Sequence, residues 1–241
     1  MAYTSWRGVV GVVKPTMRPG SLEEFIRLLP EGIGVIPLFL NIRRGTEDEF
    51  RQVMEGFEQK VAELAELKVD LIHPEGAPPF MVRGYKGERE IVEKWEKKHK
   101  IPIVTAGMTQ VEALRTLKVK KILGVTYFTG KINDTFSRYF VEAGFEVVAM
   151  AGISVPFEEV GKLSSQEVYA HTRKAFLKYP QVDAIYMLGS GWRTLDIISL
   201  LEQDLQVPVV HSVPARVWAI QKRLHVRQPV KGYGRLLEEM P

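Results

Sequence analysis

The sequence predicts an α/β protein built from two pseudo-symmetric, Rossmann-like halves, each a four-stranded parallel sheet flanked by helices, with a small-molecule site in the cleft between them. Two observations lead to this prediction. Short apolar runs rich in Val and Ile alternate with longer amphipathic stretches along the 241 residues, and the order of motifs recurs in the second part of the chain. Strands of a parallel sheet are buried on both faces and are joined by helical crossovers, which produces such an alternation.

The first half contains two marked helix starts. Ser21 with Glu24, and Thr46 with Glu49, match the capping-box pattern, in which a hydroxyl is followed three residues later by a glutamate. The second of these helices is expected to run to about Lys68. The expected strands of this half are residues 9–13, 33–40, 69–73 and 101–105.

The same cycle restarts at Lys121. Runs rich in β-branched residues predict strands, and the amphipathic stretches between them predict helices. We expect strands at residues 122–126, 146–150, 184–188 and 207–211, and helices at residues 132–143, 165–178, 194–203 and 215–224.

Three echoes in the same order indicate a duplicated unit. Gly-Val-Val at residues 11–13 and Gly-Val-Thr at 124–126 lie 113 positions apart, and so do two Val-Asp pairs. These pairs are residues 69–70 and 182–183. The third echo, shifted by a few residues, is Ile-Pro-Ile-Val at 101–104 and Val-Pro-Val-Val at 207–210.

The repeat also predicts how the chain divides and where it binds a ligand. We expect one half to comprise residues 1–110 plus 216–241, and the other half residues 111–215. Parallel α/β sheets bind ligands at the carboxyl ends of their strands. Two facing sheets therefore place both sets of strand ends around one cleft.

Composition narrows the classes of function. The chain has no cysteine, which excludes disulfides, thiolate metal sites and a cysteine nucleophile. The net charge of +4 is spread over interleaved acids and bases, so we expect no nucleic-acid partner. No apolar run reaches the ~20 residues of a membrane span, and the N-terminal residues lack the pattern of a signal peptide. We expect a cytoplasmic protein without a membrane partner, with oligomerisation left open.

No cofactor is expected. The five histidines lack the spacing of a metal site, and no glycine-rich phosphate loop or dinucleotide fingerprint occurs. The tract Gly189-Ser190-Gly191 leads into an expected helix and could cradle an anion with its backbone N–H groups. Thr16 and Arg18 follow the first strand, and Arg18 and Arg193 are the guanidinium groups best placed to pair with a substrate carboxylate.

Three further side chains at strand ends are acid–base candidates. Glu75, held between a proline and a glycine, is the first candidate for a general acid or base, against the alternative of a solvated loop acid. Tyr127 ends one strand and could aim its hydroxyl into the cleft or pack between elements. His211 ends another strand, whereas His73 is favoured as a core histidine.

Several of these motifs together resemble a known group. They are the run from Gly11 to Thr16, Thr126-Tyr127, the tract of residues 183–196, and Ala215 with Trp218. This combination resembles the aspartate/glutamate racemase superfamily, within it the branch of arylmalonate decarboxylase and maleate isomerase. The resemblance covers nearly the whole chain and implies two pseudo-symmetric α/β halves with the site between them.

The resemblance also implies where chemistry is located and where this chain departs from the pattern. Family members carry cysteines at the ends of the third and seventh strands, positions that fall near Glu75-Gly76 and at Gly189. Because neither is cysteine here, racemization by two thiols is excluded. The family's hydroxyl-bearing pair is replaced by Ala77-Pro78. Tyr127 matches the tyrosine of the oxyanion site, and Arg18 falls where maleate isomerase carries a carboxylate-binding asparagine.

The expected function is that of a cofactor-independent lyase, decarboxylase-like, or an isomerase. It would act on a small carboxylic acid through an enediolate-like intermediate, with Glu75 in place of a thiol and Gly76 and Gly189 at the substrate. Two alternatives stay open: a glutamate-assisted hydrolase or hydratase/isomerase of a small cyclic or unsaturated acid, and a catalytically silent carboxylate-binding protein.

Overall fold

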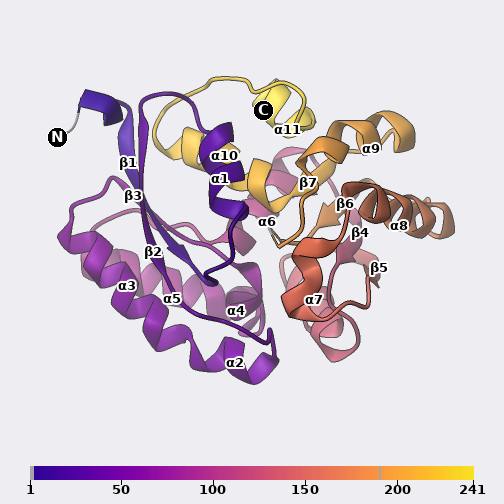
Figure 1. Ribbon diagram of the computed structural model, residues 1–241, viewed down its shortest axis with the longest axis horizontal. Coiled ribbons are helices and arrows are strands. Elements are labelled where there is room, and N and C mark those ends of the chain that lie inside the picture. The colour runs from indigo at the N-terminus through magenta and orange to yellow at the C-terminus, as the bar shows by residue number, and fades with distance from the viewer. Residues whose placement is uncertain (1–2, 190) are drawn as a thin grey trace.

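The computed structural model describes residues 3–189 and 191–241. It contains two separate parallel sheets that lie side by side, with helices around both (Figure 1). Every strand pairing in the two sheets is parallel, which confirms the predicted fold class. The strand orders are β2 (Ile33–Phe39), β1 (Gly8–Lys14), β3 (Leu71–Pro74) in the first sheet and β5 (Glu146–Gly152), β4 (Lys121–Thr126), β6 (Ala184–Met187), β7 (Val209–His211) in the second.

The first sheet has three strands, so the prediction of a strand at residues 101–105 is wrong. Ile103 makes only an isolated parallel bridge with Ile72. Thr105 is already the N-cap of the next helix, where its hydroxyl accepts the Met108 N–H at 3.2 Å. The segment therefore turns into that helix before a ladder forms.

Helices cover both sheets, and most expected ones are present with shifted ends. The expected helix from Thr46 to Lys68 is divided at Val53 into two helices. The one expected at 194–203 starts as a short 3-10 turn, Leu195–Ile197. The helices are α1 (Ser21–Leu28), α2 (Glu47–Gln52), α3 (Met54–Glu66), α4 (Ala77–Met81), α5 (Gly84–His99), α6 (Ala106–Thr116), α7 (Lys131–Glu142), α8 (Ser165–Lys178), α9 (Ile198–Leu205), α10 (Ser212–Arg223) and α11 (Arg235–Glu239).

One of the two predicted helix starts is confirmed and the other is wrong by one residue. The Thr46 hydroxyl accepts the Glu49 N–H at 3.3 Å, as expected. In α1 the Glu23 carboxylate accepts the Gly20 N–H at 2.7 Å, one residue before the predicted Ser21–Glu24 pair. Gly20 occupies the cap because its φ of 103° lies in a region that residues with a Cβ rarely adopt.

The repeated Val-Asp pair has a structural role at the starts of β1 and β4. At the start of β1, Asp70 Oδ2 accepts the Val9 N–H at 2.7 Å, and at the start of β4, Asp183 Oδ2 accepts the Lys121 N–H at 2.8 Å. The repeated Val-Asp pair therefore anchors the first residues of the central strand in each sheet.

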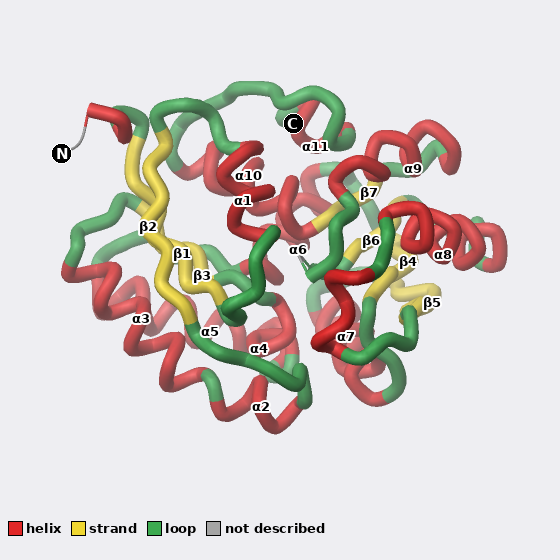
Figure 2. The backbone as a smooth tube through the Cα atoms, in the orientation of Figure 1, coloured by secondary structure: helices red, strands yellow, loops and turns green. Residues whose placement is uncertain are grey.

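Helix α10 joins the two halves. It packs against α6 and α1 and follows directly on β7 (Figure 2). One buried cluster includes Val10 and Phe25 of the first half together with Tyr186 and Trp218, so the core is continuous across the junction. The boundaries of the halves at residues 110 and 216 stay a prediction. No helix in the described ranges is both long and apolar enough to cross a membrane.

Candidate functional site

The carboxyl ends of strands from both sheets converge on one cavity of about 70 Å³. This is room for several water molecules or a small acid, at ~10–15 Å³ per water. The location agrees with the rule that parallel α/β sheets bind ligands at their carboxyl ends. Most of the described lining comes from the segments after β1, β3, β4 and β6 and from α10, and the segments after β2 and β5 and helices α2 and α6 add one residue each. The lining residues are Lys14, Pro15, Thr16, Arg18, Pro19, Ser21, Ile42, Phe50, Glu75, Gly76, Ala77, Pro78, Pro79, Ala106, Tyr127, Phe157, Gly189, Gly191, Ser212 and Arg216.

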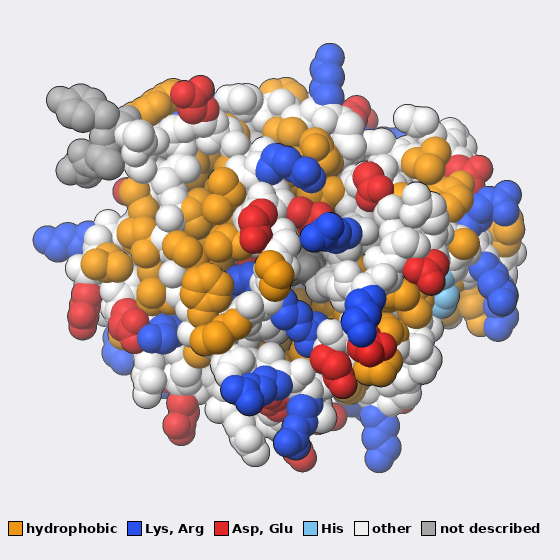
Figure 3. All heavy atoms as spheres, in the orientation of Figure 1, with side chains coloured by type: hydrophobic (Ala, Val, Ile, Leu, Met, Phe, Trp, Pro, Cys, Tyr) orange, Lys and Arg blue, Asp and Glu red, His pale blue; other side chains and the backbone are white. Residues whose placement is uncertain are grey.

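The described lining carries more positive than negative charge. Lys14, Arg18 and Arg216 are cationic, and Glu75 is the carboxylate among them. Charged side chains also surround the middle of the face shown in Figure 3, whereas hydrophobic side chains gather over β2. A cavity with this balance attracts small anions.

Glu75 and Arg216 form a buried ion pair at 2.8 Å between Oε2 and Nη1. Their side chains are 4% and 1% exposed. The other terminal nitrogen of Arg216 donates to the Ser21 carbonyl at 2.8 Å, and the guanidinium lies over the Phe25 ring at 4.4 Å. Because a buried charge needs a partner and further hydrogen bonds, these contacts hold Glu75 in the cavity wall as an ion-paired carboxylate.

Lys14 holds the segment that follows β1. Its ammonium donates to the Thr16 carbonyl at 3.1 Å, to the Thr16 hydroxyl at 3.3 Å and to the Arg18 carbonyl at 2.7 Å. Burial lowers the pKa of Lys14, and the nearby Glu75 charge opposes that shift. An ammonium has three hydrogens, so the cation fixes this loop beside the cavity.

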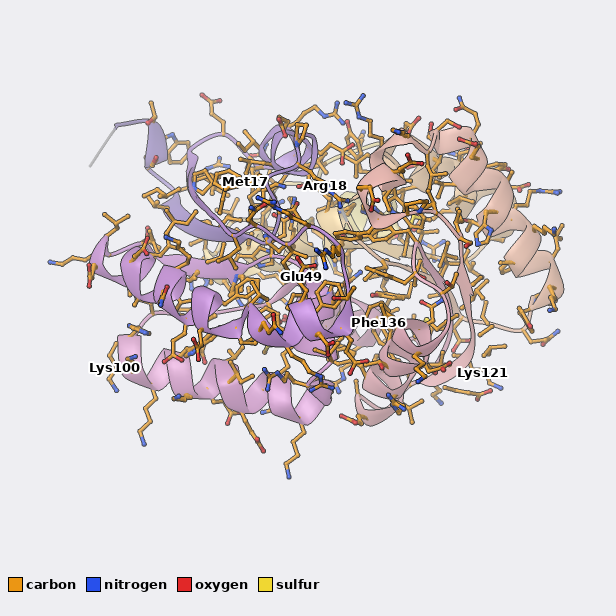
Figure 4. The ribbon with its side chains drawn as sticks, turned by 60° about the horizontal axis from the view of Figure 1, so that its bottom comes forward. Met17, Arg18, Glu49, Lys100, Lys121 and Phe136 are labelled. Atoms are coloured by element: carbon orange, nitrogen blue, oxygen red, sulfur yellow. The ribbon has the colours of Figure 1, made fainter. Side chains whose placement is uncertain are left out.

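Arg18 extends from that loop to the second half of the molecule. Its guanidinium lies 4.0 Å from the centre of the Phe157 ring, and Figure 4 shows it where the elements of the two halves meet. Phe157 lines the cavity together with Ile42 and Phe50. The cavity is therefore lined by apolar side chains as well as by cations.

Tyr127 is the main polar side chain that the second half contributes. It follows β4 directly, and burial raises the pKa of its hydroxyl above the ordinary value, so the group stays protonated. A backbone hydrogen bond with Gly191 opposes that shift. A protonated phenol in this place can donate to an oxyanion that forms in the cavity.

Gly76 and Gly189 occupy equivalent places, 113 positions apart, after β3 and β6. Both have positive φ, 91° and 81°. A Cβ at Gly76 would lie 2.6 Å from Pro15 Cγ, and a Cβ at Gly189 would overlap the Tyr127 hydroxyl. A side chain at either position would therefore require its neighbour to move.

Comparison with known proteins identifies the family. The family model described as arylmalonate decarboxylase matches residues 11–237. The chain belongs to this family. The expectation drawn from the sequence motifs is thereby confirmed at the level of the family.

Individual relatives within and near the family are distant. The arylmalonate decarboxylase of Bordetella bronchiseptica is 26% identical over 141 residues, which are 58% of this chain and 59% of that protein. A maleate isomerase of Pseudomonas putida is 23% identical over 73% of this chain and 72% of that protein. Among solved structures, the maleate isomerase Iso from Pseudomonas putida S16 superimposes with a TM-score of 0.90 at 20% identity, over 97% of this chain and 99% of that one.

Not every predicted site residue of this family member lines the cavity. His211 caps α10 instead: its Nδ1 accepts the Val213 N–H at 3.1 Å, so its Nε2–H donates to the Thr194 hydroxyl at 2.9 Å. Burial lowers the pKa of His211 to about 3, which keeps the ring neutral. The expectation that it faces the cleft is wrong, because a position at the end of a strand does not determine on which side of the strand the ring packs.

Arg193 and Ser190 complete the comparison with the predicted set. Arg193 is exposed and lines a neighbouring hollow that shares Arg18 and Gly191 with the cavity, so it lies at the rim. Ser190 lies outside the described residues. The cavity lining includes the other predicted positions: Thr16, Arg18, Glu75, Gly76, Tyr127, Gly189 and Gly191.

Four polar residues of the lining were missed as site residues from the sequence, one of which, Ser21, was expected only as a helix start. Lys14 ends an apolar run, and its place 113 positions before Tyr127 was the available signal. Ser212 and Arg216 belong to the first turns of α10, and no motif marks them. Within the described ranges, no group of three or more His, Asp or Glu side chains is arranged to hold a metal ion.

Proposed function

We propose that this member of the family is a cofactor-independent decarboxylase of a malonate-like acid with an apolar substituent, which uses Glu75 where relatives use a thiol. The observation that supports it most is the mixed lining of the cavity. It combines three cations with the apolar side chains of Ile42, Phe50 and Phe157, and Glu75 lies in the same lining.

Such a cavity favours loss of CO2. One carboxylate of the acid pairs with the cations of the lining, and the other lies against its apolar side chains, where a charge is poorly solvated. Release of neutral CO2 removes that charge, and the electron pair of the broken C–C bond moves into the remaining carboxylate as an enediolate. The cations and the Tyr127 hydroxyl stabilise the new oxyanion charge.

Glu75 then moves one proton. In the ion pair with Arg216 it is an acceptor, so it takes the carboxylic proton of a singly ionised malonate as the substrate binds. After CO2 leaves, the same proton passes from Glu75 to the α-carbon, and the carboxylate is restored. The cycle consumes no other reactant.

The ion pair also supports a second candidate. An ionised carboxylate in the resting site is a base, and it could activate water for hydration of an unsaturated acid or remove a proton during isomerisation. A silent binding protein is disfavoured, since a buried carboxylate in an anion-attracting cavity weakens the binding of an anion.

Proton NMR in D2O with substituted malonates, maleate and small cyclic amides tests these alternatives. Deuterium at the α-carbon of a monoacid product, together with loss of CO2, supports the decarboxylase. A hydrated or isomerised product with no CO2 supports the second candidate. Compounds that bind and raise the melting temperature without any conversion would overturn both enzymatic proposals.

A further inference from the structure

Two buried donors in the cavity lining have no hydrogen-bond acceptor among the described residues. They are the Ser212 hydroxyl and the Arg216 Nε–H. Ser212 is 6% exposed and Arg216 is 1% exposed. A buried donor without an acceptor costs about 1–3 kcal/mol, so two such donors side by side indicate a missing acceptor.

Both donors lie on the same side of α10. Ser212 is the first residue of this 12-residue helix, and Arg216 lies four positions later, so their side chains share a face. Both line the cavity. The positive end of the helix dipole adds to the attraction for an anion there.

The backbone of this first turn offers little in place of the side chains. The Val213 N–H is taken by His211 Nδ1, and Pro214 has no amide hydrogen. An anion at this helix start is therefore bound by the hydroxyl and the guanidinium.

The remaining contacts of Arg216 fix the direction of its Nε–H. Nη1 pairs with Glu75 and Nη2 donates to the Ser21 carbonyl, both at 2.8 Å. The plane of the guanidinium is held over Phe25. The group is thus set in place before a ligand arrives, which lowers the entropic cost of binding.

We propose that Ser212 and Arg216 form a carboxylate subsite in the wall of the cavity, with one donor for each oxygen of the carboxylate that the substrate retains. This inference rests on the proposed function and names the substrate class further: an acid whose retained carboxylate binds at α10 while its apolar group faces Phe50 and Phe157.

Phenylacetate, a monoacid that cannot lose a second carboxylate, is a suitable probe, with affinity measured by isothermal titration calorimetry. Ser212→Ala should bind it roughly tenfold more weakly than the wild type, equivalent to ~1.4 kcal/mol. Thr172→Val is the matched control, because the Thr172 hydroxyl is also buried but donates within α8 to the Val168 carbonyl. Its affinity should equal that of the wild type.

Arg216→Lys provides a second variant if Ser212→Ala does not fold. It keeps a cation beside Glu75 but removes the Nε–H, so phenylacetate should again bind more weakly. Unchanged affinity in either folded variant, or no binding of phenylacetate to the wild type, overturns the subsite. Ser212-dependent binding without turnover of any malonate leaves the subsite in place and overturns the decarboxylase instead.

Discussion

The segments that follow β3 and β6 are alike in backbone and different in charge. After β3 the Glu75 N–H donates to the Val13 carbonyl, and after β6 the Leu188 N–H donates to the Val125 carbonyl, both at 2.9 Å. A glycine with positive φ follows each donor. Glu75 is a carboxylate, whereas its counterpart Leu188, 113 positions later, is a buried apolar side chain.

The same contrast holds one strand away. Lys14 ends β1 and Tyr127 directly follows β4, again 113 positions apart, and both line the cavity. Each half of the repeat thus supplies the same backbone geometry to the site, whereas the ionised groups come from one half and from α10. A symmetric backbone with asymmetric charge gives a substrate two chemically different ends to bind.

Among variants that alter this asymmetry of charge, Glu75→Gln is expected to have the largest effect on turnover. Loss of the proton-transfer group should lower kcat for a malonate substrate by ~10²–10⁴, while the affinity for phenylacetate persists. Turnover is measured by proton NMR, with melting temperature as the check on folding, because the change leaves Arg216 with a weaker partner. An unchanged kcat in a folded variant would remove Glu75 from the mechanism.

Substitutions of Lys14 and Tyr127 are expected to have intermediate effects, one mainly on KM and the other mainly on kcat. Tyr127→Phe removes a donor to the oxyanion and should lower kcat by about 10² with a small change in KM. Lys14→Met frees the loop that carries Arg18 and should raise KM roughly tenfold with less effect on kcat. Steady-state kinetics of both variants distinguishes these outcomes, and equal effects on the same parameter would contradict the division of roles.

The smallest effect on turnover is expected from Glu88→Gln, away from the cavity. Glu88 on α5 accepts hydrogen bonds from the Thr105 hydroxyl at 2.6 Å and from the Tyr139 hydroxyl on α7, so it links the two halves. Burial raises the pKa of Glu88 from 4.5 to about 7.

This shift makes a contribution to stability that depends on pH. Because the folded protein holds the proton more tightly, the contribution is complete below about pH 4.5 and is lost as the pH rises to about 7. The melting temperature of the wild type should therefore fall more over this range than that of Glu88→Gln, as calorimetry can measure. Parallel pH profiles would contradict the assignment.

Much of the fold could be predicted because local patterns of apolar and polar residues determine it. Apolar runs separated by amphipathic stretches identified seven strands, and the Val-Asp echo pointed to a repeat whose aspartates anchor β1 and β4. The strand at 101–105 was overpredicted because apolar composition does not show that Thr105 already caps a helix. Thr16, Glu75 and Tyr127 were found because strand order places them at carboxyl ends.

The sequence by itself determined the two-sheet α/β class, the repeat, the absence of a thiol and the strand ends that surround the cavity. Only the tertiary structure decided which charges meet there. Arg216 reaches Glu75 because α10 packs between the halves, and His211 does not line the cavity because its ring caps the same helix. Contacts between residues distant in the chain depend on how helices pack. Short-range periodicity predicts the helices and strands but not that packing.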